Sequence, residues 1–340
     1  MIYRSKAPLR IGLAGGGTDV SPYSDLYGGA ILNATVSLYA HATIEPLEAD
    51  TIILQGLDRG EEQQHKSGAE LPVDGTLDLL KGVYNRIRKD FGLPATGFRL
   101  STFVDAPAGS GLGTSSTLVV AIIGVFAEML RLPLGEYDMA HLAYEIERND
   151  LKMAGGRQDQ YAATFGGVNY MEFYGEDKVI VNPLRVKQQY LFELENNLLL
   201  YYTSTSRESA KIIEKQSQNV IDKKEKSIEA MHQLKLQAQR MKEALLKGRV
   251  HEIGEILDFG FRQKLQMAEG ISNPLIEEMY ENAKKAGATG GKISGAGGGG
   301  FMTFYCPGIS KYRVMEALKA FGGYCKPYQF TDHGLTSWTI

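Results

Sequence analysis

The 340-residue sequence contains only two cysteines and one tryptophan, and it has no long apolar run and no excess of one charge. Cys306 and Cys325 lie far from any histidine or further cysteine at metal-ligand spacing, which excludes a disulfide framework and a zinc site. A single disulfide between them is an alternative, but it is disfavoured in a reducing compartment.

Membrane spans, secretion signals and polyanion binding are equally unsupported. The longest apolar run covers residues 118–127, shorter than the ~20 residues that a membrane span needs. The first residues have no apolar segment typical of a secretory signal. Basic and acidic side chains number 37 and 40, so no global charge favours nucleic acid or a membrane. We expect a cytoplasmic protein, either monomer or homodimer, without nucleic-acid or membrane partners.

Glycine is abundant instead. The chain carries 39 glycines, whereas an average usage of roughly 7% would give about 24. More than half of them fall in four clusters, over residues 12–29, 109–113, 155–167 and 287–300. Clusters separated by apolar segments favour a role in bringing backbone close to a ligand, and they disfavour low complexity.

The apolar patterns predict an α+β protein. Strands are expected over residues 30–43, 51–55, 98–104, 198–202 and 301–305. Helices are expected over residues 77–91, over 117–130 as a buried helix, around 139–146, and over 274–286 between Asn273 and Gly287. The Lys- and Gln-rich residues 206–247 favour a long solvated pair of helices over a coiled-coil role. This change in composition along the sequence predicts two domains, residues 1–185 and 186–340.

The strongest local motif is Pro-Ala-Gly-Ser-Gly-Leu-Gly-Thr-Ser-Ser at residues 107–116, between a predicted strand and a buried helix. A glycine-rich turn at a helix N-terminus exposes backbone N–H groups and the positive end of the helix dipole, which is an anion site. Hydroxyls in the first turn serve as helix caps or as ligands of phosphate or metal. A purely structural turn is the alternative.

Two common phosphate-binding motifs are absent. The Walker motif needs Ser or Thr after Gly-Lys, but Ile293 follows Gly291-Lys292. The dinucleotide fingerprint GxGxxG fails because Thr114 occupies the position of its third glycine. A Rossmann oxidoreductase is therefore disfavoured.

Residues 107–116 resemble the central nucleotide motif of the GHMP kinases. Residues 7–19 resemble the first motif of that family and residues 292–300 the third, in the same order. The resemblance implies two α+β domains with the active site in the cleft between them, and it implies ATP and Mg²⁺. It assigns nucleotide binding to Gly109, Ser110, Gly111, Leu112, Gly113, Thr114, Ser115 and Ser116.

Within the family, residues 15–19 and 154–161 most resemble the heptose 7-phosphate kinases. The implied reaction is phosphorylation of the anomeric hydroxyl of D-glycero-D-manno-heptose 7-phosphate, giving the 1,7-bisphosphate. The kinase domain of L-fucokinase has a similar first motif, so L-fucose or another free sugar is an alternative acceptor. A sensor that binds ATP and sugar without turnover is a further alternative.

The resemblance also implies roles for residues around the reacting hydroxyl. Asp159 matches the proposed base, which takes the proton of the sugar hydroxyl; a helix cap is the alternative. Arg10 matches the basic residue beside it, where a cation offsets charge developing on the transferred phosphoryl group; an exposed strand cation is the alternative. Glu147 is implied to hold Mg²⁺ together with the Ser115 hydroxyl, a set of oxygen ligands that suits magnesium. A solvated helix charge is the alternative for Glu147.

Acceptor binding is implied for Asp19, Gly16, Gly17 and Gly297. Asp19 matches an acidic residue that binds sugar hydroxyls, unless it only caps a turn. Galactokinases carry Glu-His where this chain has Gly16-Gly17, which disfavours galactose and leaves space for a larger sugar, unless the glycines only serve a tight turn.

Three basic residues, Lys152, Arg157 and Arg207, are candidates for binding a substrate phosphate. Ordinary solvated side chains are the alternative reading for all three.

Overall fold

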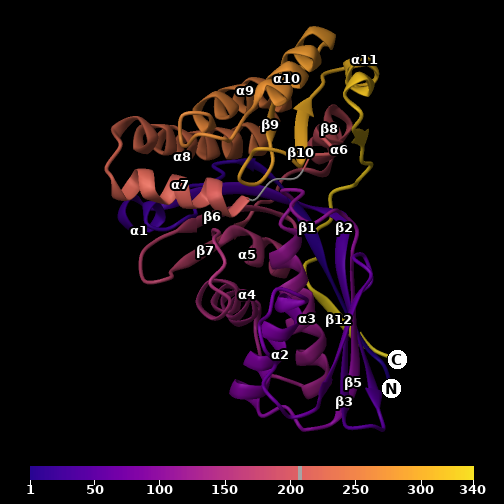
Figure 1. Ribbon diagram of the computed structural model, residues 1–340. Coiled ribbons are helices and arrows are strands. Elements are labelled where there is room, and N and C mark those ends of the chain that lie inside the picture. The colour runs from indigo at the N-terminus through magenta and orange to yellow at the C-terminus, as the bar shows by residue number, and fades with distance from the viewer. Residues whose placement is uncertain (206–208) are drawn as a thin grey trace.

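The structure is a computed structural model of the chain and describes residues 1–205 and 209–340. Two antiparallel-rich sheets and the helices around them make up these residues (Figure 1). The larger sheet has the strand order β12-β1-β2-β5-β3-β4, and β6 and β7 extend it beside β2. Its strands are β1 (Tyr3–Ala14), β2 (Gly29–Leu47), β3 (Thr51–Gly56), β4 (Glu61–Lys66), β5 (Gly97–Val104), β6 (Val168–Phe173), β7 (Val179–Pro183) and β12 (Thr336–Thr339).

Helices cover one face of this sheet, and the buried helix predicted from the sequence lies against it (Figure 1). The helices of this region are α1 (Tyr23–Tyr27), α2 (Asp78–Phe91), α3 (Thr114–Leu130), α4 (Glu136–Glu145) and α5 (Gln158–Phe165). Gly92 ends α2 in a left-handed conformation, as its position in the sequence indicates.

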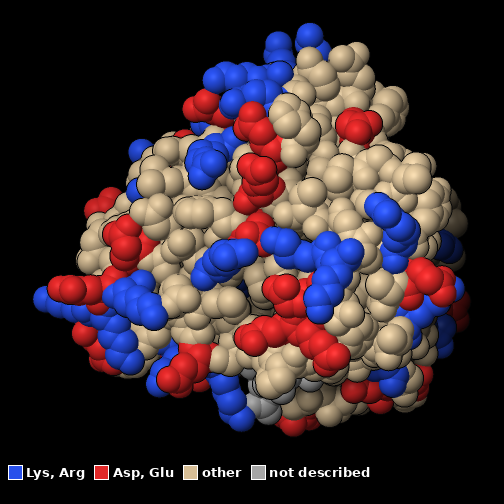
Figure 2. Space-filling model, turned by 90° about the horizontal axis from the view of Figure 1, so that it is seen from above, with Lys and Arg blue, Asp and Glu red and all other residues tan. Residues whose placement is uncertain are grey.

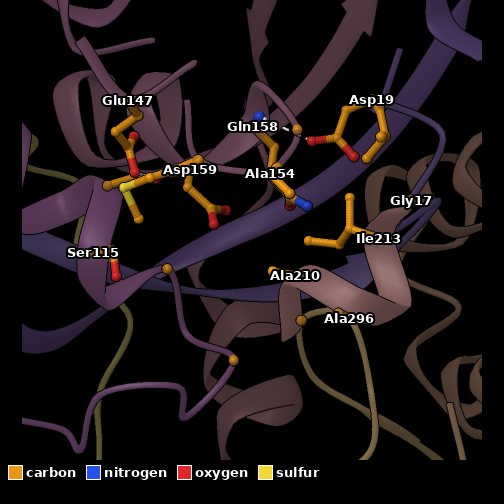
Figure 3. Close-up of a pocket in the computed structure, with 18 of the residues that line it drawn as sticks. Gly17, Asp19, Ser115, Glu147, Ala154, Gln158, Asp159, Ala210, Ile213 and Ala296 are labelled. Carbon is orange, nitrogen blue, oxygen red and sulfur yellow. Dashed lines mark hydrogen bonds between the residues drawn. The ribbon is translucent and has the colours of Figure 1, made fainter. Parts of the chain in front are cut away.

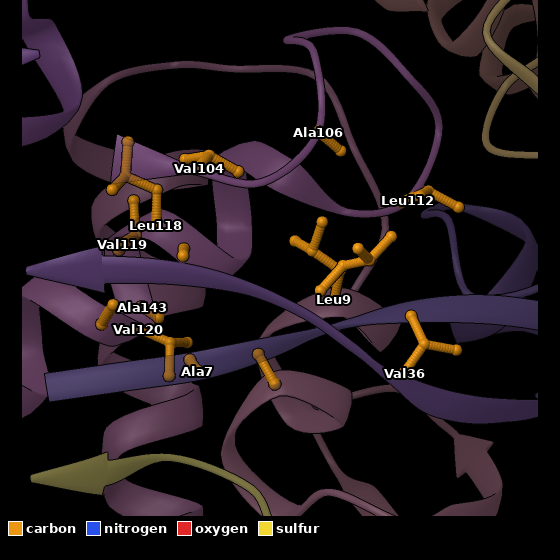
Figure 4. Close-up of a cluster of buried hydrophobic side chains, with 14 of the residues drawn as sticks. Ala7, Leu9, Val36, Val104, Ala106, Leu112, Leu118, Val119, Val120 and Ala143 are labelled. Carbon is orange, nitrogen blue, oxygen red and sulfur yellow. The ribbon is translucent and has the colours of Figure 1, made fainter. Parts of the chain in front are cut away.

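The core of this region is the contact between α3 and strands β1 and β2. Figure 4 shows Val120 of α3 beside Ala7 of β1, in a cluster that also contains Val119 and Leu9. Both faces of α3 are buried because β1 and β2 pack on one side and α2 and α4 on the other. Truncation of the fully buried Phe126 to alanine would cost ~3–5 kcal/mol of the free energy of unfolding. This packing fixes the N-terminus of α3, where the glycine-rich turn lies.

The smaller sheet has the order β11-β8-β10-β9 and is antiparallel. Its strands are β8 (Leu198–Tyr202), β9 (Gly290–Ile293), β10 (Phe301–Tyr305) and β11 (Tyr324–Cys325). The helices of this region are α6 (Gln188–Asn197), α7 (Ser209–Ile221), α8 (Glu225–Leu246), α9 (Ile253–Lys264), α10 (Pro274–Ala286) and α11 (Ser310–Leu318). Asn273 caps α10 by accepting a hydrogen bond from the Ile276 N–H, as predicted.

The predicted pair of helices is present as α7 and α8, but α8 is not a solvated helix. Met231, Leu234, Ala238 and Met241 are almost completely buried, because α8 packs on α9 and on strands β1 and β2. Polar side chains dominate the composition of α8, although one of them, Gln237, is itself buried and bonds to Ile256 of α9. The expectation of a solvated hairpin is therefore wrong for the inner face of α8.

The end of the chain returns to the larger sheet. Strand β12 pairs antiparallel with β1, and Val36 bridges to Phe330. The division at residues 185 and 186 stays a prediction, and the structure adds that the last residues join the first region. No helix in the described ranges is long and apolar enough to cross a membrane.

Candidate active site

A cleft between the two regions collects residues from all four glycine clusters. Its cavity is about 450 Å³ and is lined by Gly109, Gly111 and residues 113–116, by parts of residues 147–159, by Gly17 and Asp19, and by α7. Figure 3 shows Ser115 and Glu147 at one end, Asp19 and Gly17 at the other, and Asp159 between them. We call these the nucleotide end and the acceptor end.

Arg10 holds Asp159 at the centre of the cleft. The Arg10 Nε and Nη2 atoms both lie 2.7 Å from Oδ1 of Asp159, and Nη1 donates to the carbonyl oxygen of Gly111 at 2.6 Å. Arg10 is 4% exposed, whereas the Asp159 side chain is 24% exposed and so reaches the cavity. The pairing of β1 with β2 is irregular between Pro8 and Arg10, and such bulges redirect side chains. One rigid cation thus orients a carboxylate that a ligand can reach.

The glycines of residues 109–113 form a turn that lies against the side chain of Asp159 at the centre of the cleft. Gly109, Gly111 and Gly113 all have left-handed φ values, a conformation that side chains disfavour. A Cβ on Gly113 would lie 3.0 Å from Cγ of Asp159, and one on Gly111 would lie 2.8 Å from the backbone of Ser294. The turn therefore touches both Asp159 and the third motif.

Two buried hydroxyls at this turn have no hydrogen-bond partner among the described residues. They are Oγ of Ser110 and Oγ of Ser294, one from the second motif and one from the third. Buried polar atoms are normally satisfied, so these two hydroxyls are unusual polar positions where the second and third motifs meet, although neither residue lines the cleft. The N-terminus of α3 adds its dipole at the same place.

Glu147 lies in a single turn of π-helix, Ile146–Asp150, which follows α4. Such turns often occur at functional sites. Glu147 is 1% exposed and accepts hydrogen bonds from Ser116 Oγ at 3.0 Å and from Gln160. Burial raises the pKa of Glu147, while Arg148, Ser116 and Gln160 act to lower it.

The residues here fit a magnesium ion in part. Glu147 and Ser115 both line the cleft at the nucleotide end, as a hard oxygen set for Mg²⁺ requires. The hydroxyl bonded to Glu147 is that of Ser116, one residue beyond Ser115. No cluster of three or more His, Cys, Asp or Glu that could hold a metal occurs in residues 1–205 and 209–340. A magnesium ion here would therefore need phosphate oxygens and water to complete its coordination.

Asp19 caps the helix that carries Asp159. Its Oδ2 accepts the backbone N–H groups of Arg157 at 2.9 Å and Gln158 at 3.1 Å, at the start of α5. Burial and the charge of Asp159 raise the pKa of Asp19, and these backbone bonds oppose the shift. A Cβ on Gly156 would lie 1.9 Å from Oδ2 of Asp19. Asp19 thus acts as a cap and still lines the cleft.

The three glycines expected to bind the acceptor differ in their surroundings. Gly17 has φ +102°, and a Cβ there would lie 2.5 Å from Cε of Met267. Gly297 has φ +111° and packs against the backbone of Ile271; the residues of its loop that line the cleft are Gly295 and Ala296. Gly16 has neither restriction, since its Cβ would meet nothing closer than 3.8 Å. Of these three glycines, Gly16 is the one that neither its backbone conformation nor a steric clash requires to be glycine.

Two buried lysines at the acceptor end were missed by the sequence analysis. Lys264, at the end of α9, is 6% exposed and donates to the carbonyl oxygen of Gly295. Lys292, in β9, is 8% exposed and donates to the carbonyl oxygen of Gly12 at 2.6 Å. Burial lowers the pKa of Lys264 to about 8, with a further contribution from Arg10. Burial, Lys264 and Arg10 lower the pKa of Lys292 well below its usual value. For Lys292, the sequence signal for burial was the position of a lysine within the short strand Gly290–Ile293.

The three basic residues considered for binding a substrate phosphate differ in their surroundings. Arg157 is buried and lies 2.6 Å from Asp25 and 2.7 Å from the carbonyl oxygen of Tyr174, so it serves the structure and is not available to a substrate phosphate. Lys152 is exposed and lines the cleft. Arg207 lies outside the described residues. Figure 2 shows lysine, arginine and carboxylate side chains interspersed over the face seen from above, in line with the near-neutral composition.

Comparison with known proteins identifies the family. Residues 78–167 match the GHMP kinases N terminal domain, and residues 241–323 match the GHMP kinases C terminal domain. The chain is 49% identical to a D-glycero-alpha-D-manno-heptose 7-phosphate kinase of Campylobacter jejuni, over 99% of both chains. The chain belongs to the GHMP kinase family. It is thus an ATP-dependent kinase, as the three glycine motifs predict.

This GHMP kinase is also similar to two further proteins. A crystal structure of a D-glycero-D-manno-heptose 1-phosphate kinase from Bacteriodes thetaiotaomicron has a TM-score of 0.84 and 47% identity, over 99% of both chains. An L-fucokinase/L-fucose-1-P guanylyltransferase of Bacteroides fragilis is 26% identical over 87% of this chain and 34% of its own. The expected two-domain α+β GHMP kinase fold is confirmed.

Proposed function

We propose that the protein uses ATP and Mg²⁺ to phosphorylate the anomeric hydroxyl of D-glycero-D-manno-heptose 7-phosphate, giving the 1,7-bisphosphate. The observation that carries the catalytic part is the position of Asp159, held by Arg10 and in contact range of the phosphate-binding turn at Gly113. The full-length similarity to a heptose 7-phosphate kinase supports the acceptor.

The proposed transfer needs one base and one fixed cation. The sugar O1 attacks the γ-phosphorus, the new O1–P bond forms, and the bond from that phosphorus to the β–γ bridging oxygen breaks to release ADP. The proton of O1 passes to Asp159, whose Oδ1 is already held by Arg10, so that Oδ2 is the oxygen left to accept it. Arg10 also lies where negative charge on the transferred group is offset.

The nucleotide is proposed to lie between the turn at residues 109–116 and a second pocket. This pocket has a volume of about 280 Å³ and shares Ser115 and Met153 with the cleft. Leu79, Leu118 and Leu151 line it, and a flat apolar base suits such walls. Glu147 and Ser115 would hold the magnesium ion at the phosphates, where a bound divalent cation supplies charge neutralisation.

A panel of acceptors tests this proposal. Turnover of ATP is measured with heptose 7-phosphate, free heptose, heptose 1-phosphate and L-fucose, and ³¹P NMR identifies the product. Heptose 1-phosphate is included because one relative is called a heptose 1-phosphate kinase. Phosphorylation of heptose 1-phosphate at O7 and of heptose 7-phosphate at O1 would both give a 1,7-bisphosphate. We expect kcat/KM to be highest for heptose 7-phosphate. An equal or higher value with another acceptor would overturn the proposed substrate.

The same measurement addresses the non-catalytic alternative. A sensor would bind ATP and sugar phosphate without forming ADP, whereas the combination of Asp159, Arg10 and Glu147 around one cavity supports turnover. Binding of both ligands by calorimetry, combined with no ADP release over hours, would favour the sensor.

A further inference from the structure

The acceptor end of the cleft contains more buried positive charge than the proposed transfer uses. Arg10, Lys264 and Lys292 influence one another electrostatically, and the carboxylates beside them are Asp19 and Asp159. Arg10 already forms an ion pair with Asp159. The two lysines are more than nine-tenths buried, and the hydrogen bonds that they donate end on carbonyl oxygens, at Gly295 and Gly12.

Buried ammonium groups are costly unless a negative charge accompanies them. A carbonyl oxygen supplies only a partial charge, and Asp19 already accepts two backbone N–H groups at α5. The depressed pKa of Lys264 reflects this incomplete compensation, since burial is its largest cause. An incoming anion would therefore be stabilised at this place.

The open space lies where both lysines reach. A Cβ on Gly16 would be 3.8 Å from Nζ of Lys292 and 3.9 Å from Nζ of Lys264. Gly16 has no left-handed φ and no steric clash that demands glycine, in contrast to Gly17. A methyl group at Gly16 would be in ordinary van der Waals contact with both ammonium groups, and of these residues Lys264 lines the cavity.

We propose that Lys264, supported by Lys292 and by the space at Gly16, forms the subsite that binds the phosphate group already carried by the sugar acceptor. This inference rests on the proposed function, because a free sugar would bring no charge to the subsite. It names Lys264 as a determinant of specificity for a phosphorylated over an unphosphorylated acceptor. Arg157, Lys152 and Arg207 are not required for it.

The test compares kcat/KM for heptose 7-phosphate with kcat/KM for free heptose. Lys264→Met removes the charge and keeps most of the length of the side chain, and Lys264→Arg restores a cation. We expect Lys264→Met to reduce the ratio of the two values at least tenfold and Lys264→Arg to recover part of it. Lys285→Met, which alters an exposed lysine on α10, serves as the matched control. An unchanged ratio in Lys264→Met would overturn the subsite.

A second variant covers the case in which Lys264→Met folds poorly. Gly16→Ala fills the space in front of the lysines with one methyl group, in a backbone conformation that alanine adopts readily. We expect it to raise KM for heptose 7-phosphate by more than it raises KM for free heptose. Equal effects on the two acceptors would contradict the proposal, because loss of general packing does not distinguish them.

A binding measurement separates this inference from the proposed function. With a non-hydrolysable ATP analogue filling the nucleotide site, inorganic phosphate is titrated into wild type and Lys264→Met. Weaker binding to the variant supports the anion subsite even if the acceptor panel selects another sugar phosphate, and equal binding overturns it. If the wild type prefers heptose 7-phosphate while both variants keep that preference, the subsite fails and the proposed function stands.

Discussion

The two ends of the cleft are built in opposite ways. The nucleotide end comes mostly from one continuous segment, residues 109–116, at the N-terminus of a helix whose other faces are buried. The acceptor end is assembled from β1, the loop after it, α9 and β9, which are up to 280 residues apart in sequence, as in the bond from Lys292 to Gly12. Asp159 lies between the ends and belongs to both.

This difference has a physical reason. Polyphosphate is recognised by backbone N–H groups and a helix dipole, which a short glycine-rich turn can supply alone. A sugar phosphate presents hydroxyls and charge in several directions, so its recognition requires side chains converging from separate elements. Changes at the nucleotide end should therefore affect every acceptor equally, and changes at the acceptor end should discriminate between acceptors.

The largest effect is expected at the residue common to both ends. Asp159→Asn retains the size of the side chain but removes its ability to accept a proton as a base, so kcat should fall by roughly 10²–10⁴-fold with every acceptor. Binding of an ATP analogue, measured by calorimetry, should change little. Asp332→Asn, at a side chain 88% exposed, is the control. Turnover within a few-fold of wild type would remove Asp159 from the mechanism.

The next effect isolates the nucleotide end. Glu147→Gln should raise the Mg²⁺ concentration that gives half-maximal rate by roughly tenfold or more, and equally with all acceptors. Glu145→Gln, at a carboxylate paired with Arg86 away from the cleft, is the control. Comparing Ser115→Ala with Ser116→Ala decides which hydroxyl acts with Glu147. An unaltered Mg²⁺ dependence in Glu147→Gln contradicts the metal role.

A smaller effect distinguishes the neighbouring glycines of the acceptor end. Gly17→Ala places a side chain at φ +102° against Met267 and should lower the free energy of unfolding by ~1–2 kcal/mol. Gly16→Ala should leave stability within ~0.5 kcal/mol of wild type. Urea denaturation measures both. Equal losses of stability would show that the turn needs both glycines for its conformation.

The smallest effect is a pH dependence confined to the acceptor end. Lys264 faces Arg10, Asp19 and Lys292, and its pKa of about 8 means that it is charged below that pH and neutral above it. The kcat/KM for heptose 7-phosphate should therefore decline as pH rises through 8, since the phosphate keeps its charge there. Free heptose should show no such decline, and Lys264→Met should abolish it. Identical profiles for both acceptors would argue against the role of Lys264.

The sequence predicted the fold where the signal is local. The apolar residues 117–130 indicated a buried helix, and Asn273 with Gly287 marked the ends of α10. The burial of α8 exceeded the prediction because polar side chains dominate its composition, while Met231 and Met241 pack inward together with Gln237. Strand β12 escaped because its position depends on pairing with β1, more than 300 residues away.

In the candidate site, too, the residues with a recognisable sequence motif were predicted and those placed only by tertiary packing were not. Arg10 and Asp159 were expected to be neighbours, and the structure places them in contact. Lys264 and Lys292 gave no such expectation, because a lysine in a sequence is usually solvated and only the tertiary packing buries it. The expectation for Arg157 failed for the opposite reason: Arg157 is itself buried, and Asp25, the carboxylate that pairs with it, is 132 residues away.

The pairing of β12 with β1 also determines how the larger sheet avoids sticking to other chains. Exposed edge strands offer unpaired backbone groups to foreign strands, and proteins limit this with very short or charged edges. The edge strands here are β12, four residues long, β7, five residues long, and β4, with the sequence Glu-Glu-Gln-Gln-His-Lys. Removing residues 336–340 would leave Tyr3–Lys6, the first third of β1, paired with β2 on one side and open on the other, so we expect aggregation to increase before activity is lost.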